Sequence, residues 1–496
     1  MPRPPPGQRL PALLPALPPA LIAALLLAAF AIALGPAWQD PGLFGDDLKW
    51  RVGSFTYHPN LEREGRWLTY AWNAMLGPLP GAMALRACLA LWVLACVTVA
   101  EALAGPRRVP AMALLALALA ANPAALSLLM WPLTSLPGFL LLAAMVVAVR
   151  LAPQRPPWLA AVAAGGGLLL ALAHQLLALA AVAGAALIVL GLAAREGEAW
   201  PRRALPRLVA LAGGAAAGLL AGTLAGLALN AWMFGRFGLA EDPWRLALLG
   251  PDRPRGLAAL TPALAYHLRE WDAALQGLAL PLCAAAAALC LACLRASGAW
   301  LLALAAAAML GATLALPLAT GIPLPELRGT LLLWQGLALL AATPLLLPAP
   351  LPGPLRSMAM ALLAALPLVA LPPAASDLAR FSRMEAHNRQ EMAAMLQRVA
   401  AEAQARAEPV EALLLLGHPG RFQGLPGRVE YFWWIYFLAR AESVPLFGRP
   451  LSTRYCPLAD CPGAEIPPGL EPGGPVFPEP GSVALREGLA AIRLGP

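Results

Sequence analysis

The chain has 496 residues, of which 60% are hydrophobic and only 12% are charged. A soluble protein of this size carries about 25% charged residues, so the composition excludes an ordinary soluble enzyme and indicates an integral membrane protein. The net charge of +8 does not indicate nucleic-acid binding, because single arginines are spread over many short loops.

The N-terminal part consists of a short basic segment, Met1 to Arg9, and an apolar run from Leu10 to Gly35. This run is about twice as long as the apolar core of a signal peptide. We therefore expect a retained first transmembrane helix with its N-terminus inside. Cleavage of a signal peptide at Ala31-Ile32-Ala33 is the alternative.

Ten further apolar runs of roughly membrane-spanning length follow. The decisive region is Trp158 to Ala194, which is apolar over nearly twice the length of one crossing and is interrupted only by His174-Gln175. We place a turn there and count two helices; one long tilted helix is the alternative. The ten runs are Ala82–Ala104, Val109–Leu128, Leu133–Val149, Trp158–Ala173, Leu176–Ala194, Leu208–Trp232, Ala273–Leu294, Ala299–Leu318, Thr330–Leu347 and Ser357–Leu371.

The distribution of arginine favours eleven spans. With that number, short loops on one side carry arginines, whereas the opposite short loops around Asn122 and His174 have neither Lys nor Arg. The positive-inside rule then makes the arginine-bearing side cytoplasmic and puts the C-terminal part outside. These arginines are Arg3, Arg9, Arg107, Arg108, Arg150, Arg155, Arg195, Arg202, Arg203, Arg207, Arg295 and Arg356.

The predicted fold is an all-α polytopic membrane protein of about eleven transmembrane helices with a small α/β extracytoplasmic domain at the C-terminus. The membrane domain covers residues 1–372 and includes the first external loop, residues 36–81. The C-terminal domain covers residues 373–496.

Within the C-terminal domain, Ser376 and Asp377 can cap a polar helix that runs to about Ala407. Val410 to Leu416 is expected to form a buried strand that ends at Gly417, and Pro445 to Gly481 an irregular, Pro- and Gly-rich segment. Val429 to Ala441 is rich in aromatic residues but too short to cross a membrane.

Two of the seven cysteines, Cys456 and Cys461, lie in the polar tail. A disulfide between them is expected if the tail is outside the cytoplasm, and two free thiols are the alternative. With no other ligand nearby, the pair is weak evidence for a metal site.

The first external loop concentrates the polar chemistry of the membrane domain. Asp46 and Asp47 are adjacent carboxylates, and Lys49 is the only lysine of the chain. A helix capped by Asn60 is expected to follow, with an apolar face suited to the membrane interface. Its polar face would carry Arg63, Arg66, Tyr70 and Asn73, opposite Trp67, Leu68, Ala71, Trp72 and Met75.

These residue types suit displacement of a sugar from a lipid phosphate. A carboxylate close to a hydroxyl can act as a general base, and a second one can orient a group or a cation. Arginines bind phosphate through charge-assisted hydrogen bonds. Asp46 and Asp47 are therefore the catalytic candidates, and Lys49, Arg63, Arg66 and Tyr70 the substrate-binding candidates; solvated loop charges are the alternative. The sequence requires no cofactor, and a divalent metal is compatible with the site.

A family resemblance points to the same chemistry. Asp46-Asp47 after the first span resembles the acidic pair in the first external loop of GT-C superfamily glycosyltransferases. Gly65-Arg66-Trp67-Leu68 resembles the Gly-Arg-aromatic/Pro-Leu segment of the bacterial type II O-antigen glucosyltransferase family. Ala173-His174-Gln175 resembles that family's Tyr-Gln turn between two spans, with His174 in place of the tyrosine. The resemblance implies an inverting sugar transfer from an undecaprenyl-phosphate donor, with an Asp as the base, in the bacterial inner membrane.

Further substrate-binding candidates lie outside the first loop. His174 and Gln175 occupy a turn near the membrane, where polar residues tend to be functional, although a structural turn histidine is the alternative. Arg328 is a second phosphate-ligand candidate or a plain loop arginine. The expected partners are a polyprenyl-phosphate-linked sugar, a glycan or lipid-linked acceptor and membrane lipid.

Two other classes of function compete with sugar transfer. A transporter or flippase would have paired ionisable residues inside its spans and broken helices in repeated halves, but these spans carry almost no charge and show no repeat. An inactive scaffold for envelope assembly is the other alternative, and the intact Asp46-Asp47 pair argues against it.

Overall fold

The computed structural model describes residues 19–42, 47, 65–105, 108–197, 199–238, 256–296, 298–320, 330–347, 351–423, 435–456, 470 and 474–495. In this part of the chain, six helices are long and apolar enough to cross a membrane, and eight spans result if each of two bent helix pairs counts as one. The molecule is thus a helical polytopic membrane protein, as predicted. The six helices are α6 (Gly81–Ala104), α9 (Pro132–Leu151), α10 (Pro156–Ala173), α11 (Gln175–Ala194), α12 (Trp200–Phe234) and α18 (Gly353–Arg406).

The first bent pair lies in the predicted run Val109–Leu128, whereas in the second pair only the later helix lies in a predicted run, Ala273–Leu294. The first bends by 47° at Asn122-Pro123, where the Asn122 side chain accepts hydrogen bonds from the backbone of Ala124 and Ala125 and so caps a new helix. The second bends by 100°. The pairs consist of α7 (Val109–Ala120) with α8 (Pro123–Ser127) and the 3-10 helix η1 (Leu128–Met130), and of α14 (Leu260–Ala274), which follows the 3-10 helix η2 (Gly256–Ala259), with α15 (Ala279–Ala292).

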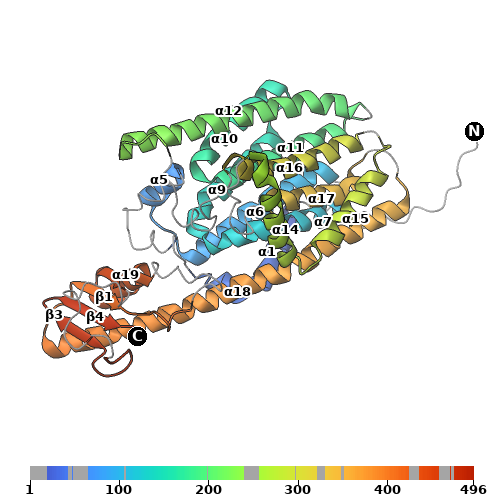
Figure 1. Cartoon of the computed structure of the whole chain (residues 1–496). Coiled ribbons are helices and arrows are strands. Elements are labelled where there is room, and N and C mark those ends of the chain that lie inside the picture. The colour runs from blue at the N-terminus through green and yellow to red at the C-terminus, as the bar shows by residue number, and fades with distance from the viewer. Residues whose placement is uncertain are drawn as a thin grey trace, which may run out of the picture.

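Three shorter apolar helices account for the remaining spans of the sequence prediction. They join the same bundle of packed helices (Figure 1). The prediction of eleven crossings stays a prediction, because these helices are shorter than a full span or only partly described. They are α1 (Pro19–Leu34), α16 (Ala299–Thr320) and α17 (Leu331–Leu346).

The region from Trp158 to Ala194 forms two helices, so the prediction of a turn at His174-Gln175 is confirmed. Helix α10 ends at Ala173 and α11 begins at Gln175. The single residue between them, His174, has extended backbone angles (φ −162°, ψ 101°) that break the helical path. The alternative of one long tilted helix is excluded by this break.

Helix α12 packs on α10 through a glycine face. Built Cβ atoms at Gly214, Gly218 and Gly222 would collide with backbone carbonyl oxygens of α10. The four-residue spacing puts these glycines on one face, and the absence of side chains lets the two backbones approach closely, as in other membrane helix pairs. The opposite face of α12 carries exposed apolar side chains such as Leu220 and Leu224.

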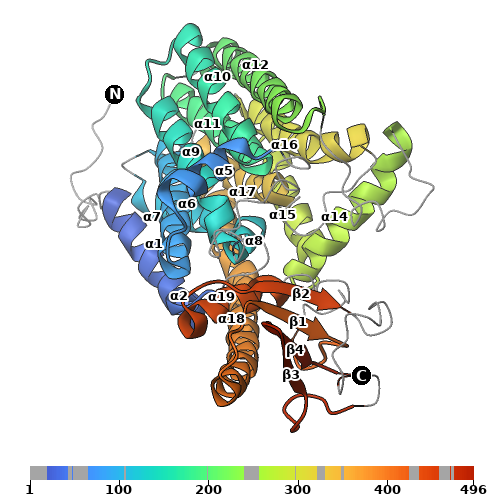
Figure 2. The ribbon, with the colours of Figure 1, turned by 90° about the vertical axis from the view of Figure 1, so that its left-hand side faces the viewer.

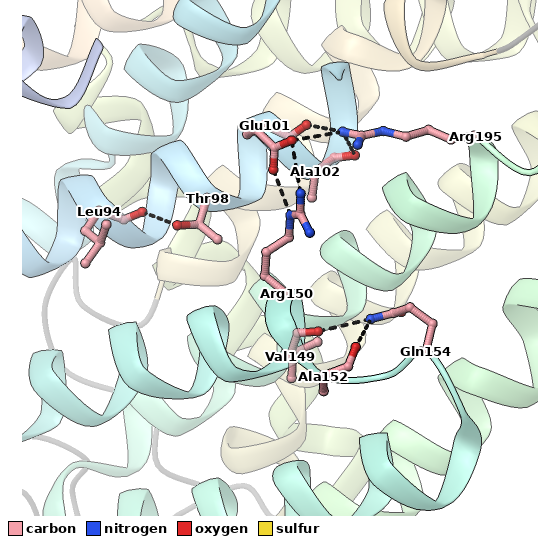
Figure 3. Close-up of polar contacts among 9 residues, drawn as sticks. All are labelled: Leu94, Thr98, Glu101, Ala102, Val149, Arg150, Ala152, Gln154 and Arg195. Carbon is pink, nitrogen blue, oxygen red and sulfur yellow. Dashed lines mark hydrogen bonds and ion pairs between the residues drawn. The ribbon is translucent and has the colours of Figure 1, made fainter. Parts of the chain in front are cut away.

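An ionic network joins three helices at the end of the bundle opposite residues 36–81. Glu101 of α6 accepts hydrogen bonds from Arg150 of α9, whose Nε lies 2.8 Å from Oε2 (Figure 3). Arg195, which follows α11, donates to the carbonyl oxygens of Glu101 and Ala102. The arginine side chains therefore satisfy carboxylate and carbonyl groups at the C-terminal end of α6.

Helix α18 runs along the bundle and continues past it to the C-terminal sheet (Figure 1). The predicted start of a separate polar helix at Ser376 is wrong, because the helix is continuous through Pro367, Pro372 and Pro373. Proline is tolerated inside membrane helices where neighbouring groups compensate for the missing N–H. The predicted end near Ala407 is confirmed: Ala407 adopts a left-handed conformation (φ 51°) that ends the helix.

The C-terminal part forms a four-stranded sheet in the order β2-β1-β4-β3. Strand β1 is parallel to β2 and β4, whereas β3 and β4 form an antiparallel hairpin. Apolar side chains of one sheet face, such as Leu413 and Ile492, pack with α18 and α19. The elements are β1 (Ala412–Leu416), α19 (Ile435–Phe447), β2 (Ser452–Cys456), β3 (Val483–Arg486) and β4 (Leu489–Arg493).

The sequence predictions for this region are correct in part. The strand before Gly417 is confirmed as β1. The segment predicted to be irregular contains the end of α19 and strand β2, so that prediction is wrong over those residues. Cys456, at the end of β2, is disulfide-bonded, while Cys461 lies outside the described residues.

Candidate functional site

Asp47, in the loop region of residues 36–81, binds the beginning of α9. Its Oδ2 accepts a hydrogen bond from the backbone N of Leu133 (2.9 Å), and its Oδ1 accepts bonds from the backbone N (3.0 Å) and Oγ1 (2.8 Å) of Thr134. The side chain is fully buried. The first N–H groups of a helix have no acceptor within that helix, and the helix dipole favours a negative charge there. Asp47 supplies both the acceptors and the charge.

The local sequence explains why α9 takes its cap from a distant residue. The helix starts with Pro132 after Trp131, whose side chain forms no capping hydrogen bond. Proline fits the first helical position because its missing N–H would be unsatisfied there anyway. The next two N–H groups need an acceptor, and Asp47, which precedes them by more than 80 residues, provides it.

The predicted amphipathic helix of the first loop is present as α5 (Trp67–Leu76), but it begins later than expected. Gly65 has a positive φ of 65°, and Arg66 is the residue before the first helical turn. Gly65 and Arg66 are therefore not helical, and the predicted start of the helix after Asn60 is wrong for these two residues. The more N-terminal residues of the expected helix lie outside the described part of the chain.

Two hydrogen bonds from buried side chains fix α5 on the membrane domain. Trp67 Nε1 donates to Asn230 Oδ1 of α12 (2.9 Å), and Thr69 Oγ1 donates to the carbonyl oxygen of Ala173 (3.0 Å). Ala173 directly precedes His174, so α5 lies against the turn between α10 and α11. The view onto this end of the bundle shows α5 crossing the helix ends (Figure 2).

The exposed part of α5 is apolar. Met75 and Leu76 are 83% and 65% exposed, whereas Thr69 and Asn73 are buried. A helix with outward-facing apolar side chains at the end of a membrane bundle suits the lipid interface. Apolar side chains thus face outward at the C-terminal end of α5, whereas Trp67, which was predicted for the outer apolar face, is instead a buried anchor.

The start of α9 collects three of the residues that the sequence nominated. Asp47 binds its N-terminus, and Tyr70 packs against the cluster of side chains that contains Leu133. His174 is 1% exposed and packs against Gly138 of α9, where a built Cβ would lie 2.8 Å from its own Cβ. Arg66 lies four residues before Tyr70 in the sequence, and Gln175 directly follows His174.

Four nominated residues have no described position. They lie between residues 36 and 81 and in the loop before α17, outside the described part of the chain, so the structure gives no geometry for them. They are Asp46, Lys49, Arg63 and Arg328.

The segment that follows α1 is attached to the C-terminal half of α18. After the short helix α2 (Pro36–Gln39), Asp40 forms an ion pair with Arg389, with both Nη–Oδ distances at 3.3 Å. The Ser382 hydroxyl donates to the carbonyl oxygen of Asp40. Gly42 lies against Glu385, and a built Cβ at Gly42 would be 2.8 Å from the Glu385 Cβ. This attachment could not be predicted from neighbouring residues, because the two segments that form it are far apart along the chain.

Asn230 was another residue that the sequence reading passed over. It is the only carboxamide residue inside the long apolar run of α12 and is fully buried. Its Oδ1 accepts the Trp67 hydrogen bond, and its Nδ2 donates to the carbonyl oxygen of Gly238 (2.8 Å). An isolated polar residue in such a run was the signal that could have revealed it.

Trp67→Phe is expected to destabilise the protein by about 1–3 kcal/mol, because the Asn230 carboxamide loses its buried donor. Phenylalanine retains most of the apolar contact, so the loss reports the hydrogen bond. Thermal unfolding of the purified protein measures the effect. Trp72→Phe is the control, since Trp72 is on the same helix, is only half-buried and is not the anchor. Equal melting temperatures for the two variants would contradict this role of Trp67.

Among the described residues, no group of three His, Cys, Asp or Glu side chains could hold a metal ion. No family model, curated protein or solved structure matches the chain.

Proposed function

We propose that this protein is a membrane glycosyltransferase that moves a sugar from a polyprenyl-phosphate donor to a glycan or lipid-linked acceptor with inversion at the anomeric carbon. The proposal assigns the reaction to the end of the bundle that carries α5 and the first external loop, facing outward from the bacterial inner membrane. The acceptor hydroxyl is deprotonated as it attacks the sugar, and the polyprenyl phosphate leaves as an anion.

The observation that carries the proposal is the buried contact of Asp47 with α9. A loop carboxylate that accepts three hydrogen bonds from one helix end is held in a fixed position at the edge of the membrane domain. Asp46 is its neighbour in the sequence, and the proposal uses Asp47 as the support for it. A catalytic group requires such support, because small displacements from the productive geometry are costly.

The hydrogen bonds of Asp47 suggest different roles for the two carboxylates. Both Asp47 oxygens already act as acceptors, so this side chain is poorly suited to take a proton from an acceptor hydroxyl. We assign the positioning role to Asp47 and the general-base role to Asp46. In this division of roles, Asp47 acts through the backbone of the loop and does not touch the substrate.

The donor phosphate is assigned to the N-terminal end of α5, where Arg66 lies. Arg66 precedes a helix that two buried hydrogen bonds hold against α12 and the His174 turn. A guanidinium on such a support can bind phosphate bidentately, and the exposed apolar residues of α5 can contact the polyprenyl chain in the bilayer. Arg63, Arg328 and Lys49 are the further cationic residues in this assignment, with Tyr70, His174 and Gln175 as the other polar contacts.

Sugar transfer is tested directly with the purified protein in lipid nanodiscs. A set of radiolabelled polyprenyl-phosphate sugars is supplied with lipopolysaccharide and polyprenyl-linked glycans as acceptors. Label is expected in the acceptor, with release of polyprenyl phosphate and inversion of the anomeric configuration. If no donor in the set is consumed, while a known enzyme of this type is active in the same nanodiscs, the proposal is contradicted.

A further inference from the structure

The extramembrane half of α18 buries a continuous stripe of side chains. The stripe repeats at alternating steps of three and four residues, which is the spacing of one helical face. Two of its members, Glu385 and Asn388, are polar. The stripe comprises Leu378, Phe381, Glu385, Asn388, Met392, Met395 and Val399.

The two polar members differ in how their polar atoms are satisfied. Asn388 donates to the carbonyl oxygen of Gln423 (2.9 Å) and accepts from the Gln423 backbone N (2.8 Å). Glu385 is 0% exposed, yet neither of its carboxyl oxygens has a hydrogen-bond partner among the described residues. A buried carboxylate in that situation is costly, so Glu385 requires an explanation that Asn388 does not.

Glu385 is covered by the first external loop. Gly42, in a left-handed conformation (φ 72°), lies directly on its Cβ and Cγ, and a larger residue there would be strained and would collide with them. On either side of Glu385 along α18, Ser382 and Arg389 bind Asp40. The segment from Asp40 to Gly42 is thus attached to one helical face of α18, with Glu385 beneath it.

The charges that face Glu385 come from α18 itself, from the Asp40 segment and from α19. Arg389 lies one turn further along α18 but donates to Asp40 of the loop. Asp40 and Glu442 of α19 are both negative and disfavour a second negative charge at Glu385. Helix α8 and η1, which also pack on this part of the bundle, carry no titratable residue.

We propose that Glu385 is a proton-controlled latch for the start of the first external loop. While its carboxyl group is neutral, residues Asp40 to Gly42 stay seated on α18. When the group ionises, the buried negative charge next to Asp40 and Glu442 drives this segment off α18 so that water can reach the carboxylate. The attachment of the loop thereby depends on the proton concentration on that side of the membrane.

The direction of the pH dependence follows from the environment of the group. Burial raises the pKa of Glu385 from 4.5 to about 8; Arg389 opposes this rise, and Asp40 and Glu442 add to it. The seated state therefore binds a proton that the released state gives up between these two values. The stabilisation is complete below pH 4.5 and is lost as the pH rises towards 8.

Hydrogen–deuterium exchange of the wild-type protein measures the latch directly. The backbone amides of residues 36–42, including the Asp40 N–H bonded to Pro36, are expected to be protected at pH 6 and to lose protection at least tenfold by pH 9. Rates are corrected for the intrinsic pH dependence of exchange. Protection that stays constant over this range would overturn the proposal.

Glu385→Gln removes the ionisable group but keeps its size, so residues 36–42 should stay protected at pH 9. The melting temperature of this variant relative to wild type is expected to rise by on the order of 5 °C between pH 5 and pH 8. Glu402→Gln is the control: Glu402 pairs with Arg398 and Arg406 on α18, and its difference from wild type should not follow this pH course. If Glu385→Gln does not fold, Glu385→Met replaces it as a second uncharged variant.

A Glu385 variant that loses protection with pH as wild type does would overturn the latch, as would a melting-temperature difference independent of pH. These measurements use no sugar donor or acceptor. Their outcome is therefore independent of the proposed sugar transfer.

Discussion

Asp46→Asn is expected to lower the rate of sugar transfer by a factor of about 10² to 10⁴, because asparagine keeps the size of the side chain but cannot take up the proton of the acceptor hydroxyl. The variant should retain the wild-type melting temperature, since Asp46 is assigned a chemical role. Transfer of labelled sugar in nanodiscs measures the rate at saturating donor, and thermal unfolding measures the stability.

Asp47→Asn should lose transfer for a different reason. Its carboxamide keeps one acceptor oxygen but presents an NH₂ group to N–H donors at the start of α9, where Asp47 now accepts from Leu133 and Thr134. Leaving buried donors unsatisfied costs about 1–3 kcal/mol. A lower melting temperature together with reduced transfer is therefore the expected signature of the positioning role.

Asp377→Asn is the matched control, because Asp377 is an exposed carboxylate on α18 whose partner Arg380 is also exposed. Surface pairs of this kind contribute little, so this variant should resemble wild type in both assays. Wild-type transfer rates in both Asp46→Asn and Asp47→Asn would contradict the mechanism, whatever their stability.

The features that the sequence predicted well are those that depend on neighbouring residues. Apolar runs identify membrane helices, because every backbone group inside a bilayer must be satisfied within its own helix. The polar pair His174-Gln175 marks a turn because a polar interruption in a long apolar run is costly within lipid. Gly417 after a short apolar run marks the end of β1 in the same local way.

The features that the sequence missed depend on contacts between distant segments. Nothing near Asp47 indicates that it binds the beginning of α9, more than 80 residues later. Glu385 lies in a helix that the sequence predicts to be polar, and nothing near it in the sequence indicates that Gly42 packs on its side chain. Two of the incorrect predictions have local causes, however. The positive φ of Gly65 interrupts the helical path, so α5 begins after it. The Glu487-Gly488 turn joins β3 and β4 into a hairpin that was not predicted.

The glycine face of α12 has the same nonlocal character. The glycines are visible in the sequence, but their partner helix is not. The contact is reciprocal, because a Cβ built on Gly167 of α10 would lie 3.0 Å from the carbonyl oxygen of Ala215 on α12. Both helices also carry anchors of α5, namely Asn230 on α12 and Ala173 on α10. The spacing of these two helices therefore sets the position of the candidate site.

Gly218→Ala is expected to destabilise the protein by about 3 kcal/mol, at the upper end of the range for overpacked cores. The new methyl group would meet the backbone carbonyl oxygen of Ala164, which cannot move aside as a flexible side chain could. The two helices must separate or shift along each other. Thermal unfolding in the same detergent or nanodisc measures the loss.

Gly213→Ala provides the control on the same helix, because a Cβ at Gly213 has no neighbour within 4 Å. Alanine is the better helix former by up to about 1 kcal/mol, so this variant should match or slightly exceed wild-type stability. Any general effect of adding a methyl group to α12 appears in both variants, and only the contact with α10 separates them. Equal melting temperatures for Gly218→Ala and Gly213→Ala would show that this close helix contact does not stabilise the membrane domain.

If the contact does hold α5 in place, Gly218→Ala should also weaken donor binding, since α10 and α12 carry the acceptors of the two hydrogen bonds that support Arg66.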